Sequence, residues 1–312
     1  MMKKFINSQE TITEEELAGF GLAYGDILTV DDHTVVSRAL ADADRVTIVT
    51  YGGSGHEPAQ KGFVGPGMLD IQVDGDIFAA PNGAAVFEAM KLADKGHGVL
   101  LLTLNYAGDQ LAGKQAMKLA KKAGMNVRQV VTGEEIRYNE ECEDNQRGLA
   151  GCVPVYHIAA AAAAEGKSLE EVAAIAQRFA DNMATLAVAV RGATHPQTGT
   201  LLADLGEDDM EIGMGQHGEG GGGRQPMKSA DETAEIMVNA LLKDIGIQSG
   251  EKVMLIINGS GATTLMEQLI VYRAAVKELA KQDIEVVANF VGEMLTVQEQ
   301  AGFQMFMARM DD

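Results

Sequence analysis

The chain is poor in cysteine and in basic side chains, and each shortage excludes a class of protein. Its two cysteines, Cys142 and Cys152, are too few for a disulfide framework or a four-cysteine zinc site, so we expect two reduced thiols. Lys and Arg number 25 against 45 Asp and Glu, which gives a net charge of -20. A field of that sign repels phosphate backbones and anionic lipid, so nucleic acid and membrane surfaces are excluded as favoured partners.

Long apolar runs are also missing. No stretch reaches the roughly 20 apolar residues that a membrane-spanning helix needs. The amino terminus has the basic Lys3 and Lys4 of a signal peptide, but residues 7–10 are polar where the apolar segment should follow. We therefore expect a cytoplasmic protein. Only 6 prolines accompany 36 glycines, which favours tight turns inside a packed α/β protein over disorder.

Hydrophobic runs alternate with helical patterns along all 312 residues. Predicted strands occupy residues 45–51, 99–104, 126–131, 185–190, 252–258 and, as the last strand, 285–291. Predicted helices occupy residues 115–123, 155–164, 168–182 and 263–280. The alternation predicts two α/β domains, each a mostly parallel or mixed sheet flanked by helices. We place them at residues 1–182 and 183–312.

Three glycine motifs imitate well-known sites, and each departs from them in a physically important place. Residues 108–115 match a phosphate-binding loop until Gln115, which replaces the Ser or Thr hydroxyl that holds magnesium. Residues 213–218 match the dinucleotide fingerprint, but more glycines follow instead of a helix. In residues 52–56, His56 stands where a nucleophile elbow has its second glycine. A nucleotide-binding enzyme therefore stays a minor alternative, which would require ATP binding by this chain alone.

Three polar clusters remain as candidate sites. Residues 52–58 follow the first predicted strand and place His56, a possible general base, among glycines whose backbone can approach a ligand. Residues 105–109 follow the next strand and end at Asp109, which either orients His56, accepts a hydrogen bond from a substrate hydroxyl, or serves only a turn. Residues 211–219 hold His217 in a glycine-dense loop. We expect structural roles for the other histidines, His33, His97, His157 and His195.

These clusters carry a resemblance to a known family. The chain resembles the substrate-binding (K) subunit of dihydroxyacetone kinase, of the two-part type linked to the phosphotransferase system. The similarity runs from residue 2 almost to the end. It rests on the motifs GGSGHEP (52–58), GFVGPGML (62–69), DIFA (76–79), NYxGD (105–109) and GxGxHGE (213–219), which occur in the family's order.

The resemblance implies both an activity and its residues. His217 captures the ketone of a short ketose covalently as a hemiaminal, which excludes glycerol because glycerol has no carbonyl. His56 and Asp109 act on the terminal hydroxyl, with His56 as the base during phosphoryl transfer, and the backbone of Gly53, Ser54 and Gly55 holds substrate oxygens. The resemblance implies catalytic roles for His56, Asp109 and His217, substrate binding by all six residues, and no metal ligand.

The resemblance also implies partners. No nucleotide-binding domain follows before Asp312, so we expect no cofactor in this chain, with ADP or ATP and Mg²⁺ held by a separate helical L subunit. A phosphotransferase-system protein then supplies the phosphoryl group indirectly. The family further implies a homodimer. The nearly uncharged residues 153–164 offer an apolar surface for it, although burial of this stretch within one chain explains the pattern equally well.

Two positions depart from the family pattern. Leu104 replaces the lysine that usually precedes the NYxGD motif, and Ala80 stands where many members have serine. Loss of an ammonium near the substrate leaves open a longer ketose, such as the tetrulose erythrulose, in place of dihydroxyacetone. A second alternative is a ketose-sensing coactivator that binds without catalysis, although such a sensor needs His217 and not the pair His56 and Asp109.

Overall fold

The computed structural model describes residues 3–138 and 146–311. The chain forms two compact units. The first contains Met1–Thr132, Cys152–Arg178 and Pro196–Gly199, and the second contains Gly133–Gly151, Phe179–His195 and Thr200–Asp312. Each unit is built around its own six-stranded sheet.

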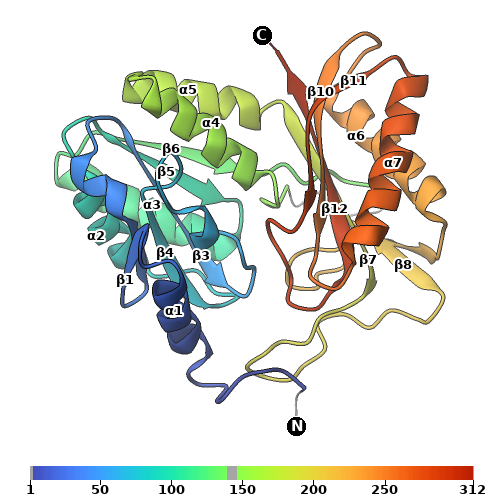
Figure 1. Cartoon of the computed structure of the whole chain (residues 1–312), viewed down its shortest axis with the longest axis horizontal. Helices are drawn as coiled ribbons and strands as arrows, with labels where there is room; N and C mark the ends of the chain where they lie inside the picture. Colours follow the sequence, from blue (N-terminus) through green and yellow to red (C-terminus); the bar gives the residue numbers. More distant parts are fainter. Residues whose placement is uncertain (1–2, 139–145, 312) are drawn as a thin grey trace. The chain divides into compact units, whose positions relative to one another are not determined.

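Helices and strands alternate along most of the chain (Figure 1). In order they are α1 (Ile12–Ala23), β1 (Leu28–Asp31), β2 (Thr34–Ser37), η1 (Arg38–Asp42), β3 (Thr47–Ser54), η2 (Lys61–Phe63), β4 (Ile71–Ile77), α2 (Gly83–Ala93), β5 (Val99–Leu104), α3 (Ala107–Lys122), β6 (Val127–Thr132), α4 (Cys152–Ala164), α5 (Leu169–Ala180), β7 (Met183–Arg191), β8 (Asp209–Ile212), β9 (Gly223–Pro226), α6 (Ala230–Ile245), β10 (Lys252–Gly259), α7 (Leu265–Lys281), β11 (Glu285–Gly292) and β12 (Ala301–Met310).

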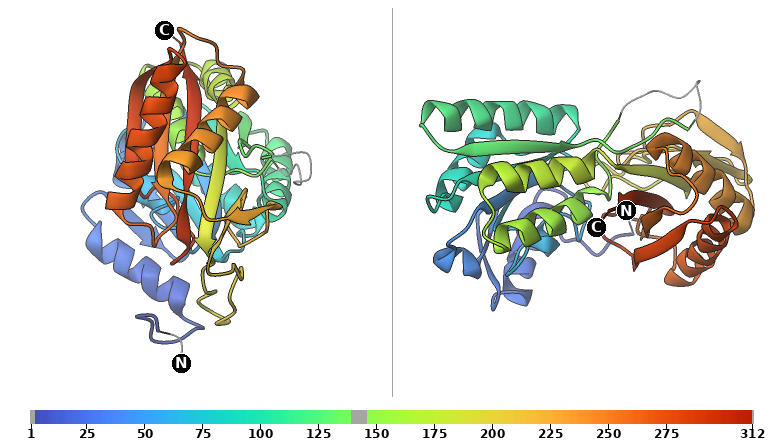
Figure 2. Two further views of the ribbon diagram at one scale, coloured as in Figure 1. Left: turned by 90° about the vertical axis from the view of Figure 1, so that its right-hand side faces the viewer. Right: turned by 90° about the horizontal axis from the view of Figure 1, so that it is seen from above.

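The sheet of the first unit has the strand order β1-β2-β4-β3-β5-β6. The four strands β4, β3, β5 and β6 run parallel, whereas β1 and β2 pair antiparallel at one edge. Alternate residues of β3 face opposite sides of the sheet: Tyr51 belongs to the core under α2 and α3, whereas Thr50 lies 3.5 Å from the hydroxyl of Tyr156 in α4. Helices therefore cover both faces, as the view from above also shows (Figure 2).

The sheet of the second unit has the order β11-β10-β12-β7-β8-β9, and only β10 and β11 are parallel. Helices α6 and α7 pack on one face through a core that includes Val238, Leu255 and Met305. Both helices begin with a capping box, Ser229 with Glu232 and Thr264 with Glu267, which satisfies amide groups of the first turn.

The expected class, two α/β units with mixed sheets, is confirmed. The strand predictions at β3, β5, β6, β7, β10 and β11 are also confirmed. Two predictions were wrong. Helix α3 begins at Ala107 and not at Gln115, so residues 108–114 are helical and form no phosphate-binding loop. The segment 285–291 is not the last strand, because β12 follows it and lies between β10 and β7.

Two further findings concern the absences noted in the sequence. Every helix in the described part of the chain is too short or too polar to cross a bilayer. Cys152 is buried at the start of α4, whereas Cys142 lies outside the described residues.

Candidate functional site

Three neighbouring parallel strands of the first unit, β4, β3 and β5, end at the same edge of their sheet. The segments that follow them contain Phe78, His56 and Asp109 respectively. Open α/β sheets bind ligands outside the carboxyl ends of their strands. The structure thus places His56 and Asp109 at one edge, as the sequence motifs predicted.

Two glycines allow the end of β3 to approach the segment after β4. A Cβ on Gly53 would lie 2.7 Å from the amide nitrogen of Ala79, and one on Gly55 would lie 2.7 Å from the Phe78 ring. Gly55 also has a φ of 102°, a left-handed conformation that side chains disfavour. Larger residues at either position would therefore displace the backbone at this edge.

The groups around His56 are held by local hydrogen bonds. The His56 side chain is only 8% exposed, and its ring centroid lies 5.0 Å from that of Phe78. The amide of Gly55 donates to Oε1 of Glu57 at 2.9 Å. The buried hydroxyl of Ser54 donates to the carbonyl of Gly75 in β4 at 2.9 Å, so this hydroxyl is used within the sheet.

Asp109 lies in the first turn of α3, where a carboxylate interacts favourably with the helix dipole. The hydroxyl of Tyr51 donates to the backbone carbonyl of Asp109 at 2.7 Å and lies 3.0 Å from the hydroxyl of Thr103. Burial raises the pKa of Tyr51, and the negative charge of Asp109 raises it further, so the phenol stays protonated as a donor. This contact joins β3, β5 and α3 directly beneath Asp109.

The two positions that depart from the family pattern lie at the same edge. Leu104, the last residue of β5, is 5% exposed. The Cβ of Ala80 lies 3.4 Å from the place where a Cβ on Gly108 would stand, so its methyl group faces the first turn of α3. Both are apolar groups beside the segment that ends at Asp109.

His217 belongs to the second unit, in the loop between β8 and β9. Its amide donates to Oε2 of Glu219 at 2.8 Å, and its ring Nδ1 lies 3.1 Å from Oε1 of the same carboxylate. Burial acts to raise the pKa of Glu219, but the hydrogen bond and charge of His217 lower it to about 2. The carboxylate is therefore ionised and assigns the proton of the imidazole to Nδ1.

Sequence reasoning missed Arg147, which contacts the His217 loop at Gly213 and Glu219. Arg147 is 7% exposed and makes a two-pronged ion pair with Glu135, with N···O distances of 2.6 and 2.5 Å. Its guanidinium also donates to the carbonyl of Gly213 at 3.1 Å and lies 3.6 Å from Glu219. A Cβ on Gly215 would lie 2.2 Å from Nη1 of Arg147, so this close packing requires glycine.

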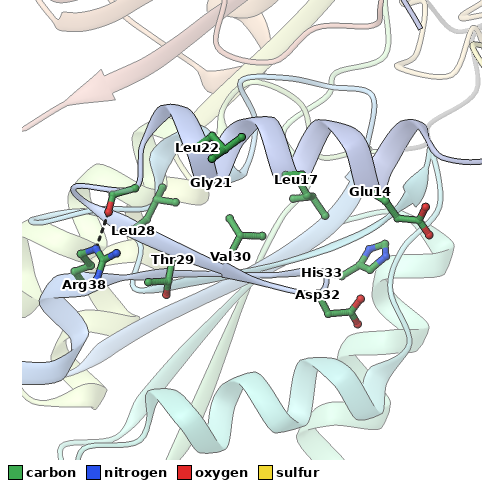
Figure 3. Close-up of a pocket in the computed structure, with 12 residues that line it drawn as sticks. Glu14, Leu17, Gly21, Leu22, Leu28, Thr29, Val30, Asp32, His33 and Arg38 are labelled. Carbon is green, nitrogen blue, oxygen red and sulfur yellow. Dashed lines mark hydrogen bonds between the residues drawn. The ribbon is translucent and has the colours of Figure 1, made fainter. Parts of the chain in front are cut away.

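A separate pocket of about 680 Å³ lies in the first unit, between α1 and the β1–β2 hairpin (Figure 3). Leu17 and Val30 form part of its apolar wall, and Arg38 closes one end by donating to the carbonyl of Gly25 at 2.8 Å. None of the predicted site residues lines it. Within residues 3–138 and 146–311, no group of three or more His, Cys, Asp or Glu side chains has the arrangement of a metal site.

The chain is thus an α/β protein with two features: polar residues at the carboxyl edge of the first sheet, and a histidine of the second unit that is held by a carboxylate. Comparison with known proteins identifies the family: the Dak1 domain matches residues 18–312, and the chain belongs to the Dak1 family. The chain is 36% identical over 312 residues to the dihydroxyacetone-binding subunit DhaK of the PTS-dependent dihydroxyacetone kinase of Lactococcus lactis. That alignment covers 99% of this chain and 94% of the relative.

Two solved structures are also similar. The dihydroxyacetone kinase operon co-activator Dha-DhaQ has a TM-score of 0.92 and 29% identity, covering 96% of this chain and 93% of that one. The dihydroxyacetone kinase of C. freundii in complex with AMP-PNP and Mg²⁺ has a TM-score of 0.89 and 28% identity, covering 100% of this chain and 58% of that one.

Proposed function

We propose that this chain is the ketose-binding subunit of a two-part dihydroxyacetone kinase. The observation that carries the proposal is the contact between His217 Nδ1 and the ionised carboxylate of Glu219. A proton held on Nδ1 makes Nε2 the nucleophilic nitrogen of the ring. The likeness to a dihydroxyacetone-binding subunit supplies the substrate class.

Covalent capture then follows from simple addition chemistry. The lone pair of His217 Nε2 forms a bond to the carbonyl carbon, and the π electrons of the carbonyl move to oxygen. The oxygen gains a proton and Nδ1 gives up its own, so the product is a neutral hemiaminal. Glu219 stabilises the transient positive imidazole during this exchange. A neutral imine cannot form, because the bonded ring nitrogen carries no hydrogen to lose.

At the sheet edge of the first unit, His56 accepts the proton of the terminal hydroxyl while that oxygen bonds to the incoming phosphorus. Asp109 orients the hydroxyl, and the backbone at Gly53 holds substrate oxygens, since the Gly55 amide already donates to Glu57. ATP with Mg²⁺ on a separate helical L subunit would supply the phosphoryl group, and the bond from phosphorus to the leaving ADP would break as the new bond forms. A phosphotransferase-system protein in the cytoplasm recharges that nucleotide.

Mass measurement of the intact protein tests the capture step. Incubation with dihydroxyacetone should add the full mass of one dihydroxyacetone, because a hemiaminal forms without loss of water. Peptide mapping should locate the added mass at His217. The variant His217→Ala should remain unmodified. An adduct that persists in His217→Ala, or a free ketone beside an intact imidazole in a crystal of the soaked protein, would contradict the proposal.

A second candidate function is a non-catalytic ketose sensor that activates transcription. The TM-score of 0.92 to an operon co-activator favours it. A sensor needs His217 for capture but has no use for a base at His56. Phosphorylation of dihydroxyacetone by this chain with its L subunit would support the kinase, whereas ketose capture without any transfer would support the sensor.

A further inference from the structure

A lysine is buried next to the candidate site and plays no part in the chemistry proposed above. Lys61 begins the short helix η2 and is only 1% exposed. Its Nζ lies 2.9 Å from Asp74 Oδ2, 3.0 Å from Glu57 Oε1 and 3.1 Å from Glu16 Oε1. One ammonium thus meets three carboxylates, all from different segments of the first unit.

Two of these carboxylates, Asp74 and Glu57, lie next to the segment that contains His56. Asp74 of β4 is the register partner of Gly52 in β3, just before the glycine turn. Glu57 follows His56 directly, and its Oε1 accepts both the Lys61 ammonium and the amide of Gly55. Glu16 reaches the same ammonium from α1.

The charges of the cluster keep Glu57 ionised. Burial opposes ionisation of Glu57, but Lys61 and the amide of Gly55 lower its pKa below the ordinary value. Burial acts to lower the pKa of Lys61, and the three carboxylates raise it instead, so the ammonium keeps its charge. Burial, together with the charge of Glu57, raises the pKa of Glu16 to about 7. Glu16 is therefore the carboxylate of the cluster that takes up a proton near neutral pH.

We propose that Lys61 is a positioning residue that holds the Gly55–His56–Glu57 turn against β4 through Glu57 and Asp74. The ammonium fixes the carboxylate of Glu57, the carboxylate fixes the amide of Gly55, and His56 lies between these two anchors. The inference rests on the proposed function, because His56 is the base whose place is being held.

Two matched variants separate positioning from a general structural role. Glu57→Gln and Glu16→Gln make the same substitution beside the same ammonium, but Glu57 also accepts the Gly55 amide. Both variants should be measured in the kinase reconstituted with its L subunit, for kcat and KM with dihydroxyacetone. Amide hydrogen exchange of peptides covering residues 52–60 provides a readout that needs no activity.

Glu57→Gln should lower kcat by about ten- to a hundredfold with little change in KM, because misplacing a catalytic group by about 1 Å costs up to about 10²-fold. It should also speed exchange at residues 52–60, whereas Glu16→Gln should leave kcat and exchange within about twofold of wild type. Equal responses of the two variants, or an unchanged kcat and exchange in Glu57→Gln, would overturn the proposal.

A double variant tests the lysine itself. Lys61→Met leaves Asp74 buried without its counter-charge and is expected to unfold, so Lys61→Met with Asp74→Asn removes the buried pair together. This variant should fold, still capture ketose at His217, and show the kcat loss and faster exchange of Glu57→Gln. Wild-type exchange rates in a folded double variant would contradict positioning by Lys61. If the wild-type chain transfers no phosphoryl group, the proposed function fails, while the exchange comparison still decides the role of Lys61.

Discussion

Oε1 of Glu219 lies 3.1 Å from Nδ1 of His217, and Oε2 of the same carboxylate accepts the backbone amide of His217. One carboxylate therefore fixes both the ring and the main chain of the proposed nucleophile. Arg147 in turn lies 3.6 Å from Glu219 and is itself paired with Glu135. The orientation of His217 depends on this chain of charged contacts.

Removing the charge of Glu219 should slow ketose capture. A hydrogen bond to a charged group contributes about 1.5–3 kcal/mol, so we expect Glu219→Gln to slow adduct formation by about ten- to a hundredfold. Time-resolved intact-protein mass measurement gives the rate, with thermal unfolding as the check that the variant is folded. A rate equal to wild type would mean that Glu219 does not set the reactive nitrogen.

His56→Asn should separate capture from phosphorylation. The adduct at His217 should still form, while transfer in the reconstituted kinase should fall by ~10²- to 10⁴-fold, the usual contribution of a general base. Asp109→Asn should slow transfer as well, with a larger rise in KM. His157→Asn, the same change at an exposed histidine of α4, serves as the control. A loss for His56→Asn no greater than for this control would leave His56 only a binding role.

Leu104→Lys tests which ketose the site prefers. Leu104 is 5% exposed at the end of β5, next to the segment that leads to Asp109. A restored ammonium that binds a substrate oxygen should raise the ratio of kcat/KM for dihydroxyacetone over erythrulose by about tenfold. Steady-state kinetics with the L subunit measures that ratio. A ratio unchanged within about twofold would show that Leu104 only fills the core.

The buried carboxyl group of Glu134 should make stability depend on pH. Its Oε1 accepts the amides of Leu149 and Gly151, each at 2.8 Å, and burial raises its pKa from 4.5 to about 7. Between these values the folded state holds a proton that the unfolded state has lost, so the free energy of unfolding should fall as pH rises from about 4.5 to 7. Urea unfolding at several pH values measures the slope.

Glu134→Gln cannot titrate and should flatten this fall, although Glu16, whose pKa is also about 7, keeps part of it. The control is Glu88→Gln, because the Glu88 side chain is 65% exposed. A slope in Glu134→Gln as steep as in the wild type and the control would assign the pH dependence to other groups.

The chain should form a homodimer through the second unit. Of the two explanations for the apolar residues 153–164, burial within the chain holds, because most of them are buried. Instead, β11 is an edge strand that exposes Val287 and Phe290, and Leu269 is exposed on α7. Phe290→Lys should shift sedimentation at micromolar concentration from dimer to monomer, whereas Leu22→Lys, on the exposed side of α1, should not. A monomeric wild type would refute the dimer.

The sequence predicted those elements whose local pattern was unambiguous. Buried parallel strands such as β5 are continuous apolar runs, and β3, β5, β6 and β10 were located within a few residues. The parallel strand β4, whose sequence contains Asp74, Gly75 and Asp76, was not predicted. The start of α3 was missed because Asn105, Gly108 and Asp109 have the composition of a turn, while the structure uses Asp109 in the first helical turn. Strand β12 was missed because its methionines and phenylalanines have no period that separates a strand from a buried helix.

Some residues of the candidate site could likewise be found from the sequence, and others could not. His56, Asp109 and His217 could be found from motifs because each lies in a glycine-rich segment. Arg147 and Lys61 carry no such signal. Arg147 depends on Glu135 and Gly213, 12 and 66 residues away in the chain. Lys61 has one near partner, Glu57, but also depends on Glu16 of α1 and Asp74 of β4. Only the folded chain brings these charges together, so no local pattern could have revealed them.

The close approach of Gly113 to the Tyr51 hydroxyl limits which glycines of this chain can be replaced to raise its thermal stability. Replacing a helical glycine with alanine is a common stabilising change, worth about 0.5–1 kcal/mol. At Gly113 the new methyl group would lie 2.3 Å from the Tyr51 hydroxyl oxygen and 2.8 Å from the side-chain Nε2 of Gln129. Thermostable designs of this chain should therefore keep Gly113 and seek their gains at helix positions away from the sheet edge.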